Sequence, residues 1–277
     1  MRLGYNTNGF AHHRWQDTLS ILSELGYQSV ALTLDHNLLD PYQATSQDID
    51  DIKCVLQEHG MHCVIETGAR FLLDPFHKHE PTLLHPDAER RALRIDFLKR
   101  CIDLAKMLDA DAVSFWSGIL KQDISYSTAL DRLSEGCQEV LDYAEDKHIR
   151  LAFEPEPGML IESMAQFAEL KDRLPSPVFG LTMDIGHLQC VEEQPIARYL
   201  KDWSSLIYNI HIEDMKTGIH EHLKFGHGDI DFAPIFQTLQ SSGYDYGIHV
   251  ELSRHSHEAP TAAAESMEFM RKMLNNE

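Results

Sequence analysis

The sequence lacks the features that would place the chain in a membrane or among disulfide-rich secreted proteins. None of its 277 residues belongs to an uninterrupted apolar run approaching ~18 residues, and the N-terminus has no apolar segment typical of a signal peptide. The five cysteines lie far apart and form no CxxC pair, so neither a disulfide framework nor a thiolate zinc site is indicated. We therefore expect a cytoplasmic protein with no membrane partner and with reduced cysteines lining its core.

Positive charge is also scarce. Lys and Arg number 24 against 44 Asp and Glu, which gives a formal net charge of -20. A surface this negative repels a phosphate backbone, so the composition disfavours a nucleic-acid partner. The contents of 43% hydrophobic and 25% charged residues are ordinary for a globular protein, and they exclude disorder, collagen-like repeats and coiled coil.

Short apolar or β-branched runs alternate with longer segments of helical period along the whole chain. We count eight such strand–helix pairs, and their average length of about 35 residues fits a (β/α)₈ TIM barrel. The predicted strands are Leu3 to Asn8, Ser29 to Leu34, His62 to Thr67, Ala112 to Trp116, Leu151 to Glu154, Phe179 to Met183, Ile207 to Ile212 and Gly247 to Leu252.

Helix signals and the absence of a linker support one barrel domain. A doubly wound open sheet would usually have a Gly-rich phosphate turn after its first strand, and Asn6 to Phe10 is not GxGxxG. No linker or composition shift divides the chain, so we expect an α/β protein with a single TIM-barrel domain over residues 1–277. The clearest helices are Asp87 to Leu108, Thr128 to Lys147 with Ser127 as its cap, and Ala262 to Leu274 after Thr261, while Gly26 and Gly60 mark helix ends.

The longest stretch without periodicity, Gly68 to Pro86, follows the third predicted strand. Loops in this position lie over the catalytic face of a barrel, so we predict that it forms a lid or a pocket wall. Its side chains Arg70, Lys78, His79 and His85 are expected to be solvated, because loops collect polar residues whatever their role.

Catalytic groups of a TIM barrel lie at the C-terminal ends of its strands. Four neighbouring strands here end in an acidic or imidazole side chain, and the residues are Glu154, Asp184, His211 and Glu251. A lone acid in so acidic a chain is usually a solvated surface group, but one at the end of an apolar strand is partly buried and needs a partner. Packed carboxylates repel unless a cation neutralises them. We therefore predict one divalent ion on these four ligands, with Mn²⁺ as first choice and Mg²⁺, Co²⁺ or Zn²⁺ as alternatives.

Five segments then carry a resemblance to a known family. They are Leu151 to Glu154, Asp184 to His187, His211 to Lys216, Phe225 to Phe232, and Val250 with Glu251. In this order they resemble the sugar isomerase/epimerase superfamily of xylose isomerase-like barrels, which includes ketose 3-epimerases, hydroxypyruvate isomerases, inosose dehydratases and apurinic-site endonucleases. The resemblance covers nearly the whole chain and implies the same four metal ligands. It also implies that Glu154 and Glu251 are the catalytic acid/base groups, on opposite faces of a bound hydroxycarbonyl sugar.

Five further residues are predicted to contact substrate. The resemblance implies that His187 touches a hydroxyl or carbonyl oxygen, and that Lys216 lies near the place of a substrate-gripping Arg in several epimerases. At strand ends, Glu66 could bind a sugar hydroxyl and Trp116 could cover an apolar sugar face. Glu156 is either a substrate contact at the rim or a spare surface carboxylate.

The run His220-Glu221-His222 looks like a metal motif, and in the endonuclease branch this neighbourhood supplies ligands to a three-metal cluster. That cluster also needs histidines at the ends of the third and fourth strands, where this chain has Glu66 and Trp116. With the negative net charge, this disfavours a nuclease. We predict that His222 is part of the pocket wall.

The sequence thus predicts a metal-dependent isomerase or epimerase that transfers a proton next to a carbonyl of a small sugar, sugar acid or cyclitol. A dehydratase is the first alternative, because elimination begins with the same proton abstraction. A metal-dependent phosphodiesterase and a non-catalytic binding barrel are the others. Phosphorylation of the substrate stays open, since Gly226 to Gly228 could present N–H groups to a phosphate or form an ordinary turn. Related barrels often form homo-oligomers, but no apolar stripe locates an interface here.

Overall fold

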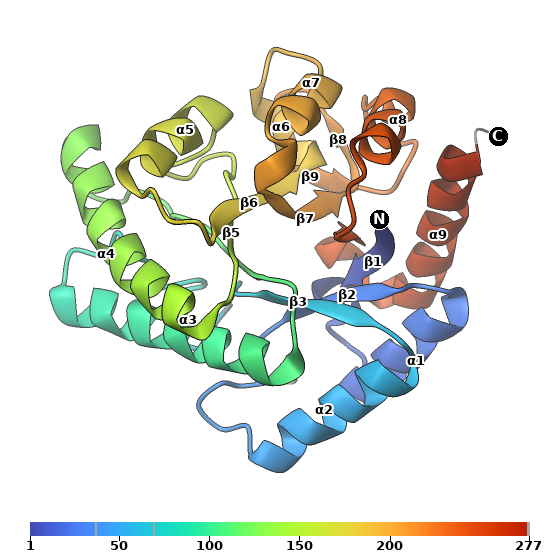
Figure 1. The fold of residues 1–277 in the computed structure, drawn as a ribbon, viewed down its shortest axis with the longest axis horizontal. Coiled ribbons are helices and arrows are strands. Elements are labelled where there is room, and N and C mark those ends of the chain that lie inside the picture. Colours follow the sequence, from blue (N-terminus) through green and yellow to red (C-terminus); the bar gives the residue numbers. More distant parts are fainter. Residues whose placement is uncertain (37, 69, 276–277) are drawn as a thin grey trace.

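The computed structural model describes residues 1–36, 38–68 and 70–275, and its centre is a closed barrel of parallel strands (Figure 1). The strand order around the barrel is β1-β10-β7-β6-β5-β4-β3-β2. Every predicted strand overlaps an observed one, so the predicted (β/α)₈ barrel is confirmed. The strands are β1 (Arg2–Asn6), β2 (Ser29–Thr33), β3 (His62–Glu66), β4 (Val113–Phe115), β5 (Leu151–Phe153), β6 (Phe179–Asp184), β7 (Ile207–Ile212) and β10 (Gly247–Val250).

Helices surround the barrel and cover its outer face (Figure 1). Short 3₁₀ segments lie at Thr7–Phe10, Ser204–Leu206 and Ser253–Glu258. The α-helices are α1 (Trp15–Leu25), α2 (Ser46–Glu58), α3 (Ala88–Leu108), α4 (Tyr126–Lys147), α5 (Met164–Arg173), α6 (Ile185–Val191), α7 (Ile196–Asp202), α8 (Phe232–Ser242) and α9 (Ala259–Asn275).

Capping side chains set where these helices begin. Asp87 caps α3, because its Oδ1 accepts from the backbone N of Glu89 at 2.9 Å. The predicted Ser127 cap of α4 is wrong. Ser125 is the cap instead, since its hydroxyl accepts from the backbone N of Thr128 at 3.1 Å. The last helix likewise begins at Ala259, three residues before the predicted start.

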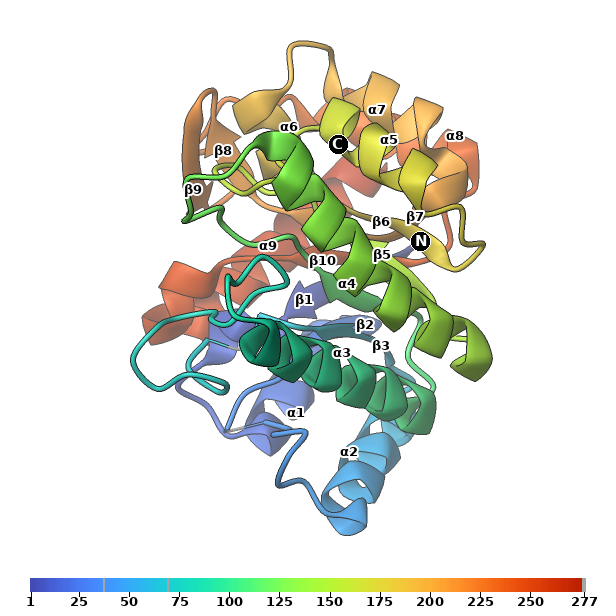
Figure 2. The same cartoon turned by 90° about the vertical axis from the view of Figure 1, so that its left-hand side faces the viewer.

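A hairpin that the sequence analysis did not predict follows β7. Strands β8 (Asp214–Lys216) and β9 (Ile219–Leu223) pair antiparallel, and Lys216 faces Ile219 across a two-residue turn. Gly218 has φ of 72°, which such tight turns require. In Figure 2 this hairpin and the long loop before α3 lie toward the same side of the molecule. Both therefore belong to the end of the barrel where the strands terminate.

The layer between barrel and helices is apolar, whereas part of the barrel interior is polar. Phe153 packs edge-on against Phe115 and Phe179, with ring centroids 5.2 and 6.0 Å apart, and all three are buried. Inside the barrel, Nδ1 of His249 lies 2.7 Å from Oδ1 of Asn209. This buried polar pair forms the floor beneath the site described next.

Two further expectations concern composition. Cys63, Cys101 and Cys137 are buried as free thiols, as predicted, but Cys54 is exposed and so does not line the core. Across the described residues, no helix has both the length and the apolar character needed to cross a membrane.

Candidate metal and active site

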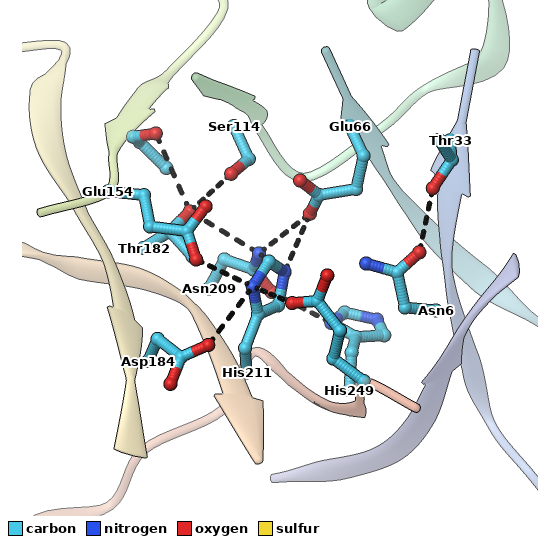
Figure 3. A network of polar contacts seen from close by, with 12 residues as sticks. Asn6, Thr33, Glu66, Ser114, Glu154, Thr182, Asp184, Asn209, His211 and His249 are labelled. Atoms are coloured by element: carbon cyan, nitrogen blue, oxygen red, sulfur yellow. Dashed lines mark hydrogen bonds and ion pairs between the residues drawn. The ribbon is translucent and has the colours of Figure 1, made fainter. Parts of the chain in front are cut away.

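The ends of β5, β6, β7 and β10 bring the four predicted metal ligands together. Figure 3 shows Glu154, Asp184 and His211 pointing toward one another. Glu154, Asp184, His211 and Glu251 each offer one ligand atom, and these atoms all lie within 4.8 Å of one another. Glu154 and Glu251 each directly follow the last residue of their strand, while Asp184 and His211 lie within theirs. The parallel barrel therefore points all four side chains toward its axis.

The imidazole of His211 is the centre of this cluster. Its Nδ1 lies 3.0 Å from Oε1 of Glu154 and 2.9 Å from Oε2 of Glu251. Oδ2 of Asp184 is 3.9 Å from the same nitrogen. Burial opposes a charge on the ring, but Glu66, Glu154 and Glu251 outweigh burial and hold its pKa well above the usual range. Positive charge is therefore favoured where the carboxylates meet.

The surroundings of Asp184 show whether a cation fits between the clustered side chains. Its side chain is buried, and Oδ1 accepts from the backbone N of His187 at 2.8 Å. Oδ2, by contrast, has no hydrogen-bond partner among the residues that the structure describes. A buried carboxylate oxygen without a partner is costly. Because this oxygen faces the same point as the neighbouring carboxylates, the donor set of three carboxylates and one imidazole fits a divalent cation.

The two glutamates of the cluster have opposite pKa shifts. Burial raises the pKa of Glu154 to about 8, a shift that His211 opposes and Glu251 reinforces. Burial also acts on Glu251, but His211 outweighs burial and holds the pKa of Glu251 well below its usual range. Nδ2 of Asn8 donates to Oε1 of Glu251 at 2.7 Å and so fixes its orientation. The sequence analysis missed Asn8, which lies in the 3₁₀ segment after β1.

Glu66 has a contact that the sequence analysis did not predict. Its Oε1 lies 2.9 Å from Nε2 of His211 and also accepts from Nδ2 of Asn209 at 3.1 Å (Figure 3). An imidazole whose Nε2–H donates to a carboxylate presents the lone pair of Nδ1 on its other side. Glu66 lines the cavity as predicted, but it also orients His211.

A cavity of about 260 Å³ lies above the cluster. Predicted residues in its wall are Glu66, Trp116, Glu154, Glu156, His187, His211, His222 and Glu251. Lys216 is not in this wall and is exposed on β8, so the structure does not place it at the cavity. Lys216 is the last residue of β8, directly before the hairpin turn, whereas the neighbouring Met215 is buried.

The long loop after β3 forms one wall of this cavity, as predicted. Arg70, Lys78 and His79 line the cavity. Arg70 and His79 are partly buried, so the prediction that they are solvated is wrong for these two, whereas Lys78 is exposed as predicted. His85 is partly buried and lies outside the wall. Burial lowers the pKa of His79 to about 3, and the nearby cations lower it further, so the ring is neutral. These contacts depend on how the loop folds back, which local sequence does not reveal.

Trp116 is held from two sides at the end of β4. Cζ of Arg94 lies 4.6 Å from its ring centroid, and the ring of His79 packs edge-on at 5.5 Å. Arg94 is buried, and its Nη1 and Nη2 have no hydrogen-bond partner among the described residues. Burial lowers the pKa of Arg94 only to about 10, so the side chain keeps its charge over the indole. Arg94 therefore helps to fix Trp116 as a cavity wall.

The hairpin adds two histidines to the cavity. Nε2 of His187 lies 3.1 Å from Nε2 of His220, and Nδ1 of His187 lies 3.1 Å from the carbonyl oxygen of Pro155. Burial lowers the pKa of His187 to about 4, so the ring is neutral. Because its Nδ1–H donates to the carbonyl, its Nε2 accepts from His220. Ligand atoms of His187, His220 and His222 also lie within 4.8 Å of one another.

A second buried acid explains a glycine of the Asp184 to His187 segment. Neither carboxylate oxygen of Glu213 has a hydrogen-bond partner among the described residues. Burial, followed by Asp184 and Glu251, raises the pKa of Glu213 well above its usual range, which favours the neutral carboxyl. A Cβ on Gly186 would lie 2.1 Å from Oε1 of Glu213, so this position has room only for glycine.

Comparisons with known proteins agree with the barrel fold. L-ribulose-5-phosphate 3-epimerase UlaE from Salmonella paratyphi A is 26% identical over 254 residues, which cover 90% of this chain and 85% of that protein. The solved structure of IOLI protein with a zinc atom has a TM-score of 0.81 at 18% identity and covers 100% of this chain and 99% of its own. 3-Keto-D-glucoside 4-epimerase from E. coli has a TM-score of 0.80 at 15% identity, covering 98% and 99%. The model of the xylose isomerase-like TIM barrel family matches residues 19–273, and the chain therefore belongs to that family.

Proposed function

We propose that this chain is a divalent-metal-dependent sugar epimerase or isomerase, which transfers a proton next to a carbonyl group. The observation that carries the proposal is the cluster of four ligand atoms, all within 4.8 Å of one another, at the floor of a polar cavity. Oδ2 of Asp184 in this cluster has no hydrogen-bond partner among the described residues. The curated relative is a sugar epimerase, and epimerases are isomerases. This supports the same reaction class here.

Glu154, Asp184, His211 and Glu251 would hold the ion, with Mn²⁺ as first choice. A divalent cation bound there would supply Lewis-acid stabilisation, worth several kcal/mol, to the negative charge that develops on the carbonyl oxygen. Glu66 supports the ligand set by accepting the Nε2–H of His211, which leaves Nδ1 available as a ligand.

Glu154 and Glu251 are the proposed acid/base groups. They follow β5 and β10, which are separated by β6 and β7 in the barrel, so their carboxylates enter the cavity from different sides. A sugar bound between them presents one face to each. Removal of a proton by one carboxylate and its return from the other inverts the carbon. Return to the neighbouring carbon on the same side isomerises the sugar instead. A positioned base of this kind typically raises the reaction rate ~10² to 10⁴-fold.

The remaining wall would bind the sugar. Trp116 offers an apolar face, and Nε2 of the neutral His187 can accept a hydrogen bond from a sugar hydroxyl in place of the one from His220. Burial raises the pKa of Glu156 well above its usual range, and the neighbouring carboxylates add to the shift, which favours the neutral carboxyl group that can donate to a hydroxyl. His222 completes the wall. From the composition of the chain, we also propose that it forms a single domain, lies in the cytoplasm and binds no nucleic acid.

The test is proton NMR in D₂O of the Mn²⁺-loaded protein with ketoses, sugar acids, inososes and their phosphates. We expect deuterium to enter next to the carbonyl, and conversion to an epimer or isomer. Both are lost with EDTA and in Glu251→Gln. An unsaturated or deoxy product would instead identify a dehydratase. No exchange and no conversion by protein shown to hold the metal would contradict the proposal.

A further inference from the structure

A second cavity of about 200 Å³ lies beside the sugar cavity. It is formed by the 3₁₀ segment Thr7–Phe10, the start of α1 and the loop after β2. Four large apolar side chains contribute to its wall, and they are Phe10, Trp15, Leu19 and Leu38. We call this second cavity the side chamber.

The side chamber and the sugar cavity share part of their walls. Asn8, Thr33 and Arg70 line both. Nη1 of Arg70 lies 3.4 Å from Oδ2 of Asp35, and its Nη2 lies 3.3 Å from the carbonyl oxygen of Asn8. Both hydrogen bonds are long and therefore weak. Of the three shared residues, Arg70 is therefore held only by two weak bonds, and its side chain can move aside for a ligand.

The two cavities differ in chemistry. The sugar cavity contains Glu66, Glu154, Glu156 and Glu251, so an apolar group placed there would displace water from carboxylates. In the side chamber the charge of Arg70 is already matched by Asp35, and much of the remaining wall is aromatic or aliphatic. A cavity of ~150 Å³ with an apolar wall is large enough for a benzene ring.

We propose that the side chamber binds an uncharged apolar substituent of the substrate, of about the size of one aromatic ring. The substrate class is then a keto sugar that carries this substituent through oxygen and keeps its carbonyl free, as in a glycoside whose carbonyl is not at the anomeric carbon. The inference rests on the proposed function, because the sugar part occupies the cavity above the metal ligands. The substituent reaches the side chamber past Asn8 and Arg70.

The experiment compares methyl and phenyl 3-keto-glucopyranosides, which differ only in the substituent. Calorimetry on the Mn²⁺-loaded protein should give an affinity at least ~10-fold higher for the phenyl compound, since burial of a ring in an apolar wall stabilises the complex. Ala11 lines the side chamber, so Ala11→Phe fills it and should bring the ratio of the two affinities close to one. The control is Ala92→Phe, the same change at an exposed position of α3, which should leave the ratio as in wild type.

A spectroscopic measurement keeps the inference testable if Ala11→Phe does not fold. The chain has three tryptophans, of which Trp15 lines the side chamber, Trp116 lines the sugar cavity and Trp203 packs against Phe167. In Trp116→Phe, the 4-nitrophenyl 3-keto-glucoside, whose ring quenches indole fluorescence on contact, should still quench Trp15. The methyl compound should not.

Each outcome decides the inference. Equal affinities of the wild-type protein for the methyl and phenyl compounds, or no binding of either, would overturn it. Failure of the proposed function is read separately, from deuterium exchange into unsubstituted ketoses. If the protein exchanges those ketoses but does not prefer the phenyl compound, the proposed function stands, and the proposal that the side chamber binds a substituent is wrong.

Discussion

Glu66→Gln should weaken metal binding although Glu66 is not itself a proposed ligand. The substitution keeps the shape of a buried side chain and one acceptor oxygen, but removes the negative charge 2.9 Å from Nε2 of His211. Loss of such a hydrogen-bonded partner of a metal ligand typically costs 10- to 100-fold in metal affinity. Each factor of ten is about 1.4 kcal/mol, so we expect a loss of about 1.4 to 2.7 kcal/mol.

Calorimetric titration of the metal-free protein with Mn²⁺ measures this loss directly. Glu135→Gln is the matched control, because Glu135 is exposed on α4 and should bind Mn²⁺ as the wild type does. If Glu66 instead contacted only a sugar hydroxyl, the substitution would raise KM and leave the Mn²⁺ affinity unchanged. That result would show that Glu66 does not support metal binding through His211.

Three further predictions follow from the same geometry. Asp184→Asn should lower Mn²⁺ affinity by at least ~10-fold because it removes one of three clustered charges, and mass spectrometry of the metal content finding wild-type occupancy would contradict this. Mn²⁺ affinity should fall as the pH falls, because the raised pKa of His211 means that a proton competes with the metal already near neutral pH. A dissociation constant for Mn²⁺ that does not change between pH 6 and 8 would exclude that competition. Phe153→Ala should reduce the free energy of unfolding in urea by about 3 to 5 kcal/mol, because Phe153 is fully buried, and a loss below about 1 kcal/mol would show that the core does not depend on this ring.

The barrel and the four clustered residues were predictable because both follow from regular spacing. Strands of a parallel barrel end at one rim, so Asp184 at the end of β6 and His211 at the end of β7 had to meet once the strands were identified. Helix starts were less predictable. Ser125 and Ser127 are both good caps, and only the backbone decides which hydroxyl reaches a free N–H.

The parts of the site that the sequence did not reveal depend on contacts between distant segments. His79 is partly buried because its loop folds onto Trp116, and no local pattern encodes that contact. Lys216 lies close in sequence to a proposed ligand, but the unexpected hairpin exposes it. Glu66 was located correctly at a strand end, whereas its partner His211 lies 145 positions further along the chain.

Proton transfer in this protein should depend on one metal centre, which the four clustered side chains form. The most direct measurement is the rate of deuterium entry into a converted ketose while Mn²⁺ is titrated into metal-free protein in D₂O. We predict that the rate rises with added Mn²⁺ and reaches its plateau at about one ion per chain. Asp184→Asn should need at least ~10-fold more Mn²⁺ for the same rise. Full exchange in the metal-free protein, or a titration curve that Asp184→Asn leaves unchanged, would contradict a metal centre on these four side chains.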